Sequence, residues 1–563
     1  MKSKVSKLVL AGSGALLSAA LMAGCGTISS TTSANAQATH RAASTSSAPP
    51  LIMAGDFANP TMTENFNPLS VNALYGTNLV YEPLYVINRI NGAQTPWLAT
   101  SYKWVNNLTL EFTIRSGVKF NNGTPFSPSD VVYTFNLMKK YPALDQNDVW
   151  ASLASVTSSG NKVIFKFSKV DIPEFYYIAT QPIVDEAQFS KVKDPVTFTN
   201  PDPIGTGPFM VQSFTGEQYD LKPNPYYWQR SKVKIPEIEI RGVTGNTSVD
   251  EWLVDGSVDW AQSFIPNMTK VYIDRNPKYY HAFQPPSSPW TIFMNLTKAP
   301  FNNVDFRKAL AYSIQRTQIV SKAEYGIMTP DYGSLLPPTM GQWLSPQISK
   351  EYKYTYNLKL AAEYLKKAGL KKNSQGQWVE KNGTPISLTL EVPAGWTDII
   401  QDGQIMVNDW KKLGLNVTEI TPSPTTDVDN LQTGHFDMAL MEAVGVPNPY
   451  FVYYSELDSN ETAPIGQVAP SNYERWRNPA TDKLLNEFAA TTNVAKQKQI
   501  MYQLQKLVAT DLPVIPYDFG VFWGEYTTLH YTGWPSYKDP YAPMQIYAYP
   551  DPLLIVTHLR PVK

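Results

Sequence analysis

The sequence predicts an α/β protein built from two large lobes, one of which is richer in strands than the other. The chain has 563 residues, and single hydrophobic cores stop growing near roughly 250–300 residues. Strand patterns dominate residues 51–290, whereas helical and strand patterns alternate through residues 290–510. Strand patterns return after residue 511, so the end of the chain is expected to rejoin a sheet.

The strand-rich part contains clear local signals. Residues 108–114 and 162–167 alternate apolar and polar side chains, which predicts two half-buried strands. Ser127 or Ser129 can cap a helix that follows at once. The apolar residues of that helix share one face, as the spacing of Val131, Phe135 and Met138 indicates.

A glycine-rich segment, residues 205–209, resembles a phosphate-binding loop only superficially. Such a loop needs a helix immediately after it, because the helix N-terminus holds the anion. Strand patterns follow instead, at residues 209–214 and 219–222. We therefore interpret the segment as a turn that enters a strand.

The second part alternates helices and strands. One helix is expected at 303–320, and another at 357–368, capped by Asn357 and closed by Gly369. A strand at 386–392, a helix at 398–413 and a strand at 415–420 form a βαβ unit, for which a right-handed crossover is expected. The pattern continues with a strand at 436–441, helices within 478–509, and a return to strands after 511–516.

The first residues have the features of a secretory signal. Three lysines precede an apolar run, residues 8–23, and the run ends on Gly24 and Cys25. We therefore predict a leader over residues 1–24. Residues 25–50 are mostly Ser, Thr, Ala, Gln, Asn and Pro, which predicts a flexible tether. Cys25 is the only cysteine, so internal disulfides are excluded.

The composition argues against several classes of function. Forty-seven basic and 48 acidic residues give a net charge of −1, so a nucleic-acid partner is not expected. The five histidines are widely spaced, and HExxH, CxxC and P-loop motifs are absent from the sequence. We expect neither a metal site nor a cofactor. The 33 tyrosines and 14 tryptophans can fill cores, and some can line a wet groove.

Two resemblances sharpen these expectations. The end of the leader resembles the lipobox of bacterial lipoproteins, in which the cysteine receives a diacylglyceryl group; this implies lipidation at Cys25. The mature chain resembles the family 5 extracytoplasmic solute-binding proteins of ABC importers. The motifs that carry this resemblance are YEPL at 81–84, the block 110–126, GTGPF at 205–209, NPYYW at 224–228, the helix start at 306–314, and FDMAL at 436–440.

The resemblance implies a periplasmic-binding-protein-like two-lobe clamp (type II) with an inserted β-rich subdomain. Ligand would be held between the lobes and enclosed when they close. The implied partition assigns 51–80, 201–290 and 515–563 to lobe I, 81–200 to the inserted subdomain, and 291–514 to lobe II.

The ligand class is argued from the family's motifs. Peptide binders often hold the ligand's α-amino group with an Asp, and the corresponding stretch here, 442–449, has Gly445 at that position and Glu442 at a Trp position. Other segments resemble the branch that binds cello- or xylo-oligosaccharides. Aromatic rings stack on sugar faces, and polar groups bond sugar hydroxyls. The candidate ligand-binding residues are Trp396, Tyr450, Tyr453, Trp523, Trp534 and Glu442.

We therefore expect the lipid-anchored substrate-binding component of an ABC importer, which delivers an elongated oligomer to a permease and its ATPase. A β-linked oligosaccharide is favoured, and an oligopeptide is the alternative. A secreted glycosidase with two carboxylates is the third hypothesis, although nothing selects a pair among acids such as Asp398, Glu442 and Glu525. The protein is expected outside the cytoplasm, anchored to a membrane by lipid, as a monomer.

Overall fold

The structure is a computed structural model that describes residues 48–58, 61–443 and 448–562. Contacts divide the chain into residues 1–46 and 47–563, and the fold below is that of the second part. The leader, Cys25 and most of the tether therefore lie outside the described residues. Within the described ranges, no helix combines the length and apolarity that crossing a membrane requires.

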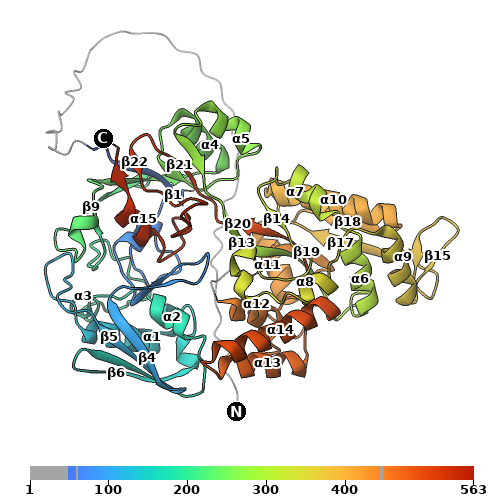
Figure 1. The fold of residues 1–563 in the computed structure, drawn as a ribbon, viewed down its shortest axis with the longest axis horizontal. Coiled ribbons are helices and arrows are strands. Elements are labelled where there is room, and N and C mark those ends of the chain that lie inside the picture. The colour runs from blue at the N-terminus through green and yellow to red at the C-terminus, as the bar shows by residue number, and fades with distance from the viewer. Residues whose placement is uncertain (1–47, 59–60, 444–447, 563) are drawn as a thin grey trace, which may run out of the picture. The chain divides into compact units, whose positions relative to one another are not determined.

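Lobe I is built on a seven-stranded sheet (Figure 1). Its strand order is β12-β21-β11-β1-β10-β9-β8, so segments from both halves of the chain belong to one sheet. The strands are β1 (Leu51–Phe57), β8 (Phe209–Phe214), β9 (Gln218–Pro223), β10 (Ile238–Val243), β11 (Trp260–Ala261), β12 (Tyr280–Ala282) and β21 (Glu525–Thr527). The helices of this region are α4 (Asn246–Asp255), α5 (Met268–Val271) and α15 (Pro552–His558).

The inserted subdomain contains a four-stranded antiparallel sheet in the order β4-β5-β7-β6. Its helix α1 (Pro128–Lys140) begins as predicted: the Ser127 hydroxyl accepts from the Ser129 amide, and the Asp130 carboxylate accepts from the Ser127 amide at 2.8 Å. The remaining elements are β2 (Tyr85–Ile87), β3 (Gln94–Pro96), β4 (Ala99–Asn106), β5 (Thr109–Ile114), β6 (Leu153–Ser159), β7 (Lys162–Phe167), α2 (Phe175–Thr180) and α3 (Glu186–Phe189).

Lobe II is built on a six-stranded sheet in the order β14-β20-β13-β19-β17-β18. Strand β17 is parallel to both β18 and β19, which confirms the βαβ pattern predicted from the sequence. The strands are β13 (Pro286–Met294), β14 (Thr329–Pro330), β17 (Ser387–Glu391), β18 (Asn416–Ile420), β19 (Met438–Glu442) and β20 (Ile515–Val521). A short hairpin of β15 (Lys371–Lys372) and β16 (Trp378–Val379) lies outside this sheet.

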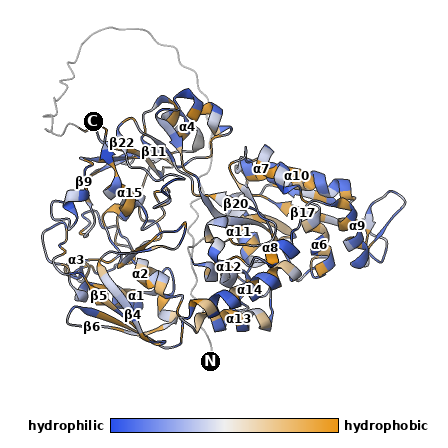
Figure 2. Cartoon of the chain, in the orientation of Figure 1, coloured by the Kyte–Doolittle hydropathy of each residue, from blue (hydrophilic) through white to orange (hydrophobic). Residues whose placement is uncertain are grey.

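Helix α10 packs an apolar stripe against this sheet. In α10 the buried residues include Ile399, Met406, Trp410 and Leu413, at helical spacing, and orange and blue residues alternate along the helix in Figure 2. The helices are α6 (Val304–Tyr312), α7 (Arg316–Lys322), α8 (Ile348–Glu351), α9 (Leu358–Lys367), α10 (Thr397–Leu413), α11 (Pro424–Thr433), α12 (Pro449–Leu457), α13 (Pro479–Ala489) and α14 (Val494–Asp511).

The prediction of a single helix at 303–320 is wrong in one respect, because the structure has two helices, α6 and α7, in this segment. The Ser313 hydroxyl donates back to the carbonyl of Ala309 at 2.9 Å, which competes with continuation of the helix. The Gln315 amide donates to the Asp409 carboxylate at 3.0 Å, so it is not available to the helical ladder. A contact with α10 therefore decides where α6 ends.

Two short segments connect the lobes, and they are hydrogen bonded to each other. The Phe283 amide donates to the Gly524 carbonyl at 2.8 Å, and the Phe522 amide donates to the Pro285 carbonyl at 2.9 Å. Strands β13 and β20, which the sequence partition grouped largely with lobe I, belong to the six-stranded sheet. We therefore propose lobe boundaries at these crossing segments, residues 283–285 and 522–524.

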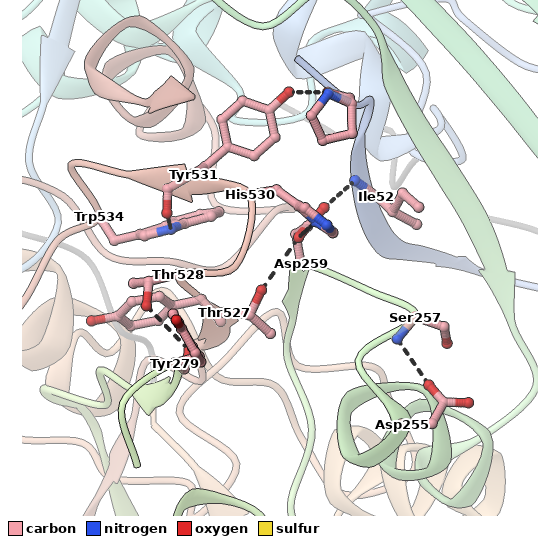
Figure 3. A network of polar contacts seen from close by, with 12 residues as sticks. Ile52, Asp255, Ser257, Asp259, Tyr279, Thr527, Thr528, His530, Tyr531 and Trp534 are labelled. Atoms are coloured by element: carbon pink, nitrogen blue, oxygen red, sulfur yellow. Dashed lines mark hydrogen bonds and ion pairs between the residues drawn. The ribbon is translucent and has the colours of Figure 1, made fainter. Parts of the chain in front are cut away.

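A buried polar network fastens the C-terminal part of lobe I to its first strand (Figure 3). Asp259 is 1% exposed, and its carboxylate accepts from the Ile52 amide at 3.0 Å and pairs with His530 at 2.7 Å. The Tyr531 hydroxyl donates to the carbonyl of Pro49, and the Trp534 indole donates to the carbonyl of Tyr531 at 3.1 Å. This network fixes the start of the fold against the segment that follows β21.

Replacing Gly524 tests the packing of the crossing segments. A Cβ atom at this position would lie 2.4 Å from the Met544 Cβ and 2.9 Å from the Phe283 carbonyl oxygen. We expect Gly524→Ala to lower the free energy of unfolding by about 1–3 kcal/mol, because overpacking forces the two segments apart. Chemical denaturation measures the change. Gly341→Ala is the matched control, since a Cβ there meets nothing within 4 Å; equal stability of the two variants would contradict the prediction.

Candidate functional site

A large cavity in lobe I lies between the seven-stranded sheet region and the inserted subdomain. It spans about 1060 Å³ of space, part of which is open to solvent, and its walls contain five tyrosines and four side-chain amides. Among the described residues that line it, none is an Asp, Glu, Lys, Arg or His. The tyrosines are Tyr75, Tyr176, Tyr177, Tyr547 and Tyr549, and the amides are Asn78, Gln146, Asn147 and Gln181.

The tyrosine hydroxyls of this cavity are neutral over the physiological pH range. Burial raises the pKa of Tyr176 to about 12, and it also raises the pKa values of Tyr177, Tyr547 and Tyr549. A neutral phenol both donates and accepts hydrogen bonds. The Tyr549 oxygen is buried without a hydrogen-bond partner among the described residues.

A second cavity of about 620 Å³ lies where the inserted subdomain meets lobe II. It shares Tyr176 with the first cavity and also has no charged residue among its described lining. Its walls include Trp343, Phe488 and the amide of Asn448. The ring of Tyr177 lies 4.7 Å from that of Phe451 on α12, so aromatic contact joins the subdomain to lobe II here.

Charged groups gather near the crossing segments instead. Glu442, at the end of β19, is exposed to solvent. Partial dehydration by the surrounding protein nevertheless raises the pKa of its carboxyl group to about 7. The Ser288 hydroxyl and the Arg89 charge act in the opposite direction. The Arg89 guanidinium lies 5.6 Å from the ring centre of Phe522 in the second crossing segment. A small cavity is lined by Arg89, by residues 286–289 at the start of β13 and by Phe522 of the second crossing segment.

Of the predicted aromatic residues, one lies on lobe II near these charges and another lies in the second crossing segment. Trp396, which is 38% exposed, precedes α10 and contacts Trp290 edge to face, with ring centres 6.0 Å apart. Trp290 is paired in register with Glu442, so both belong to one face of the sheet. Trp523 is partly buried and contacts Phe264 of lobe I at 5.8 Å.

The other predicted aromatic residues lie within the hydrophobic core. Tyr453 is 0% exposed, and its hydroxyl donates to the Ser334 carbonyl at 2.5 Å. Tyr450 is 7% exposed and stacks on Phe488, and Trp534 is 7% exposed in lobe I beside Trp260. The structure thus brings Trp396 and Glu442 into one region but not all six candidates. Their roles in binding stay predictions.

Sequence reasoning missed the residues of the tyrosine-lined cavity. Tyr75, Tyr177 and Tyr547 come from three distant segments, and no local motif distinguishes them from the other tyrosines. The unusually high tyrosine content was the one signal available. Gly445, which the ligand argument used, lies outside the described residues. The described side chains contain no group of three or more His, Cys, Asp and Glu arranged to hold a metal ion.

Comparison with known proteins places this geometry in a family. Residues 93–463 match the family described as bacterial extracellular solute-binding proteins, family 5. The nickel-binding periplasmic protein of Escherichia coli is 26% identical over 77% of this chain and 82% of its own. The oligopeptide-binding protein OppA of Bacillus subtilis is 26% identical over 73% of this chain and 76% of its own.

Solved structures agree with this placement. The periplasmic oligopeptide-binding protein of an oligopeptide ABC transporter from Thermotoga maritima superposes with a TM-score of 0.84, at 26% identity, covering 91% of this chain and 99% of that one. A structure of the same protein with mannohexaose bound gives a TM-score of 0.75 over 91% and 98% of the two chains. The fold is therefore the type II two-lobe clamp.

Members of this family are solute-binding proteins rather than enzymes; they work outside the cytoplasm with an ABC permease and its ATPase. Because the match covers more than half of the chain and the two-lobe architecture agrees, this protein belongs to the family 5 bacterial extracellular solute-binding proteins and is the substrate-binding component of an ABC importer.

Proposed function

We propose that this protein captures a neutral oligosaccharide for import. The observation that carries the proposal is the lining of the larger cavity, in which tyrosine rings and side-chain amides occur without an ionised group among the described residues. Sugar rings have apolar C–H faces that stack on aromatic rings, and hydroxyl rims that bond amides and phenols. A peptide brings a charged amino group, and burying that group without a partner is strongly unfavourable.

The size of the site supports an elongated ligand. The two cavities are both lined by Tyr176, and we infer that an elongated ligand contacts both of them. The relative whose structure contains mannohexaose is 26% identical to this chain, which is consistent with an oligosaccharide here. The relatives named for oligopeptides favour the alternative, a peptide ligand, and Glu442 is the carboxyl group that could then meet its amino group.

The proposal includes a binding role without catalysis. A glycosidase needs two carboxyl groups that flank a scissile bond. Glu525 is 0% exposed and accepts from the Ser263 amide at 2.8 Å and from the Gln284 amide group at 2.7 Å, so it is committed to the fold of lobe I. Asp398 and Glu442 lie on lobe II, outside the lining of the tyrosine-rich cavity.

We also propose that the mature chain is tethered to the membrane through lipid on Cys25, and that it acts as a monomer. The lipobox-like end of the leader and the polar residues 25–50 support the anchor. Ligand contacts made by both lobes exist only when the lobes are closed, so binding shifts the population toward closure. Bending of the paired crossing segments would accommodate that motion.

Calorimetric titration distinguishes the two ligand classes. We expect heat of binding and an increase in melting temperature with mannohexaose, cellohexaose or xylohexaose, and neither effect with di- to pentapeptides. A ligand at about 100 times its dissociation constant adds about 2.7 kcal/mol to the free energy of unfolding. Binding of peptides that requires a free amino group, without binding of any of the sugars, would reverse the assignment. Release of shorter sugars during incubation would show catalysis.

The tyrosine wall is tested by Tyr547→Ala. Tyr547 is 43% exposed in the larger cavity and contacts Tyr75, with ring centres 5.7 Å apart. We expect the free energy of sugar binding to become less favourable by about 1–3 kcal/mol, because the stacking surface is lost. Tyr226→Ala is the matched control, since Tyr226 is 47% exposed but does not line this cavity. If both variants bind as the native protein does, the wall is not the binding surface.

The contribution of lobe II is tested at Trp396. We expect Trp396→Ala to weaken sugar binding about tenfold, which corresponds to about 1.4 kcal/mol. Trp396→Phe keeps an aromatic face beside Trp290 and should retain most of the affinity. Unchanged affinity of Trp396→Ala, measured by the same titration on protein with native melting temperature, would remove Trp396 from the site.

A further inference from the structure

A group of carboxyl side chains is enclosed within lobe II, away from the tyrosine-lined cavity. Glu324 follows α7, Asp402 lies in the second turn of α10, and Asp518 is on β20. All three side chains are 0% exposed. In all three carboxyl groups, both oxygens lack a partner that satisfies hydrogen-bond geometry among the described residues.

A bulge in β20 explains why two consecutive polar residues face this group. Trp290 of β13 is opposite Asp518, whereas Thr291 is opposite Pro516, so β20 carries one extra residue. The bulge allows Tyr517 to approach Asp402 as Asp518 does. The Tyr517 hydroxyl is also fully buried, and its oxygen has no partner that satisfies hydrogen-bond geometry.

The positive charge near this group is committed elsewhere. Arg316 of α7 is 2% exposed, and its guanidinium donates to the carbonyls of Ala311, Tyr354 and Pro516. Among the neighbouring carboxyl groups, Asp331, which follows β14, interacts most strongly with the positive charge of Arg316. Arg316 therefore offsets only part of the charge that Asp518 would carry if it were ionised.

The other titratable neighbours are acidic. Asp331 accepts from the amides of Gly333 and Ser334 at 2.8 Å, which satisfies its own oxygen. Asp398, in the first turn of α10, is partly exposed and repels Glu324. On the β18 side of α10, Glu419 lies against Gly403, where a Cβ would be 2.8 Å from the Glu419 Oε2 atom.

Unpaired carboxylates are so unfavourable in such surroundings that the groups keep their protons instead. Burial raises the pKa of Glu324 to about 8, and it raises the pKa values of Asp402 and Asp518 well above the ordinary range. Mutual repulsion acts in the same direction. A metal ion is a poor alternative, because the described His, Cys, Asp and Glu side chains form no metal-binding group.

We propose that Glu324, Asp402 and Asp518 form a proton-binding site inside lobe II, which gives the native protein its greatest stability in an acidic medium. The site does not depend on the identity of the imported ligand. Two further carboxyl side chains in the described structure, Asp427 and Glu474, are also 0% exposed with both oxygens unpartnered, and they act in the same direction.

The sign of the effect follows from linkage. These groups have pKa values near 4 in the unfolded chain and higher values in the native fold. Their contribution to stability is complete below pH 4 and is lost as pH rises toward the native pKa, which for Glu324 is about 8. Over that interval unfolding releases protons, so each group raises the unfolding equilibrium constant up to about tenfold per pH unit.

Denaturant unfolding of the full chain at several pH values tests the proposal. We expect the unfolding equilibrium constant of the native protein to rise at least about 100-fold between pH 5 and pH 8. The triple variant Glu324→Gln, Asp402→Asn and Asp518→Asn imitates the protonated groups, so its pH dependence should be clearly shallower. Glu363→Gln is the control, because Glu363 is an exposed carboxyl on α9 of the same lobe, and it should keep the native slope.

Two results would overturn the proposal: stability of the native protein that is constant or rises from pH 5 to pH 8, or a triple variant with the native slope. Infrared spectroscopy gives a second measurement if the triple variant does not fold. Protonated carboxyl groups have a C=O stretching band that carboxylates lack. We expect this band in the native protein at pH 7 and a weaker band in Glu324→Gln; its absence from the native protein would also overturn the proposal.

Discussion

The pairing of the two crossing segments is the constraint on which the rest of the structure depends. Residues 283–285 and 522–524 pass between the sheets side by side and exchange hydrogen bonds. Because β13 and β20 continue directly from them as neighbours in lobe II, the same pairing sets the centre of the six-stranded sheet. Close packing at Gly524 leaves little freedom except bending about this pair, which suits a clamp whose halves must open and close around a solute.

The distribution of charge follows from this arrangement. Arg89 lies beside Phe522 of the second crossing segment, and Glu442 at the end of β19 is exposed, so solvent screens its charge. The larger cavity farther into lobe I contains neutral phenols and amides, which are dehydrated at lower cost than ions when a ligand displaces water. Specificity in such a cavity comes from the placement of rings and hydrogen-bonding groups, and a charged solute has little to compensate its lost hydration.

Carboxyl groups in this protein behave differently according to their surroundings. Glu442 is reached by solvent, and Arg89 and two serine hydroxyls favour its ionised form. Glu324, Asp402 and Asp518 have neither solvent nor a committed cation, so the proton is what makes their burial tolerable. Lobe II therefore combines an aromatic surface at Trp396 with an acid-stabilised interior that includes Asp518, which is paired in register with Trp290.

The sequence by itself determined the family, the α/β class and the approximate bounds of most elements that it predicted, because caps such as Ser127 and Asn357 and short-range periodicity act within a few residues. The break between α6 and α7 required the tertiary structure, since Asp409 reaches Gln315 from another helix. The site was likewise decided in three dimensions. Tyr453 and Tyr547 are the same residue type, and only the packing of distant segments buries one ring in the core and leaves the other 43% exposed beside a cavity.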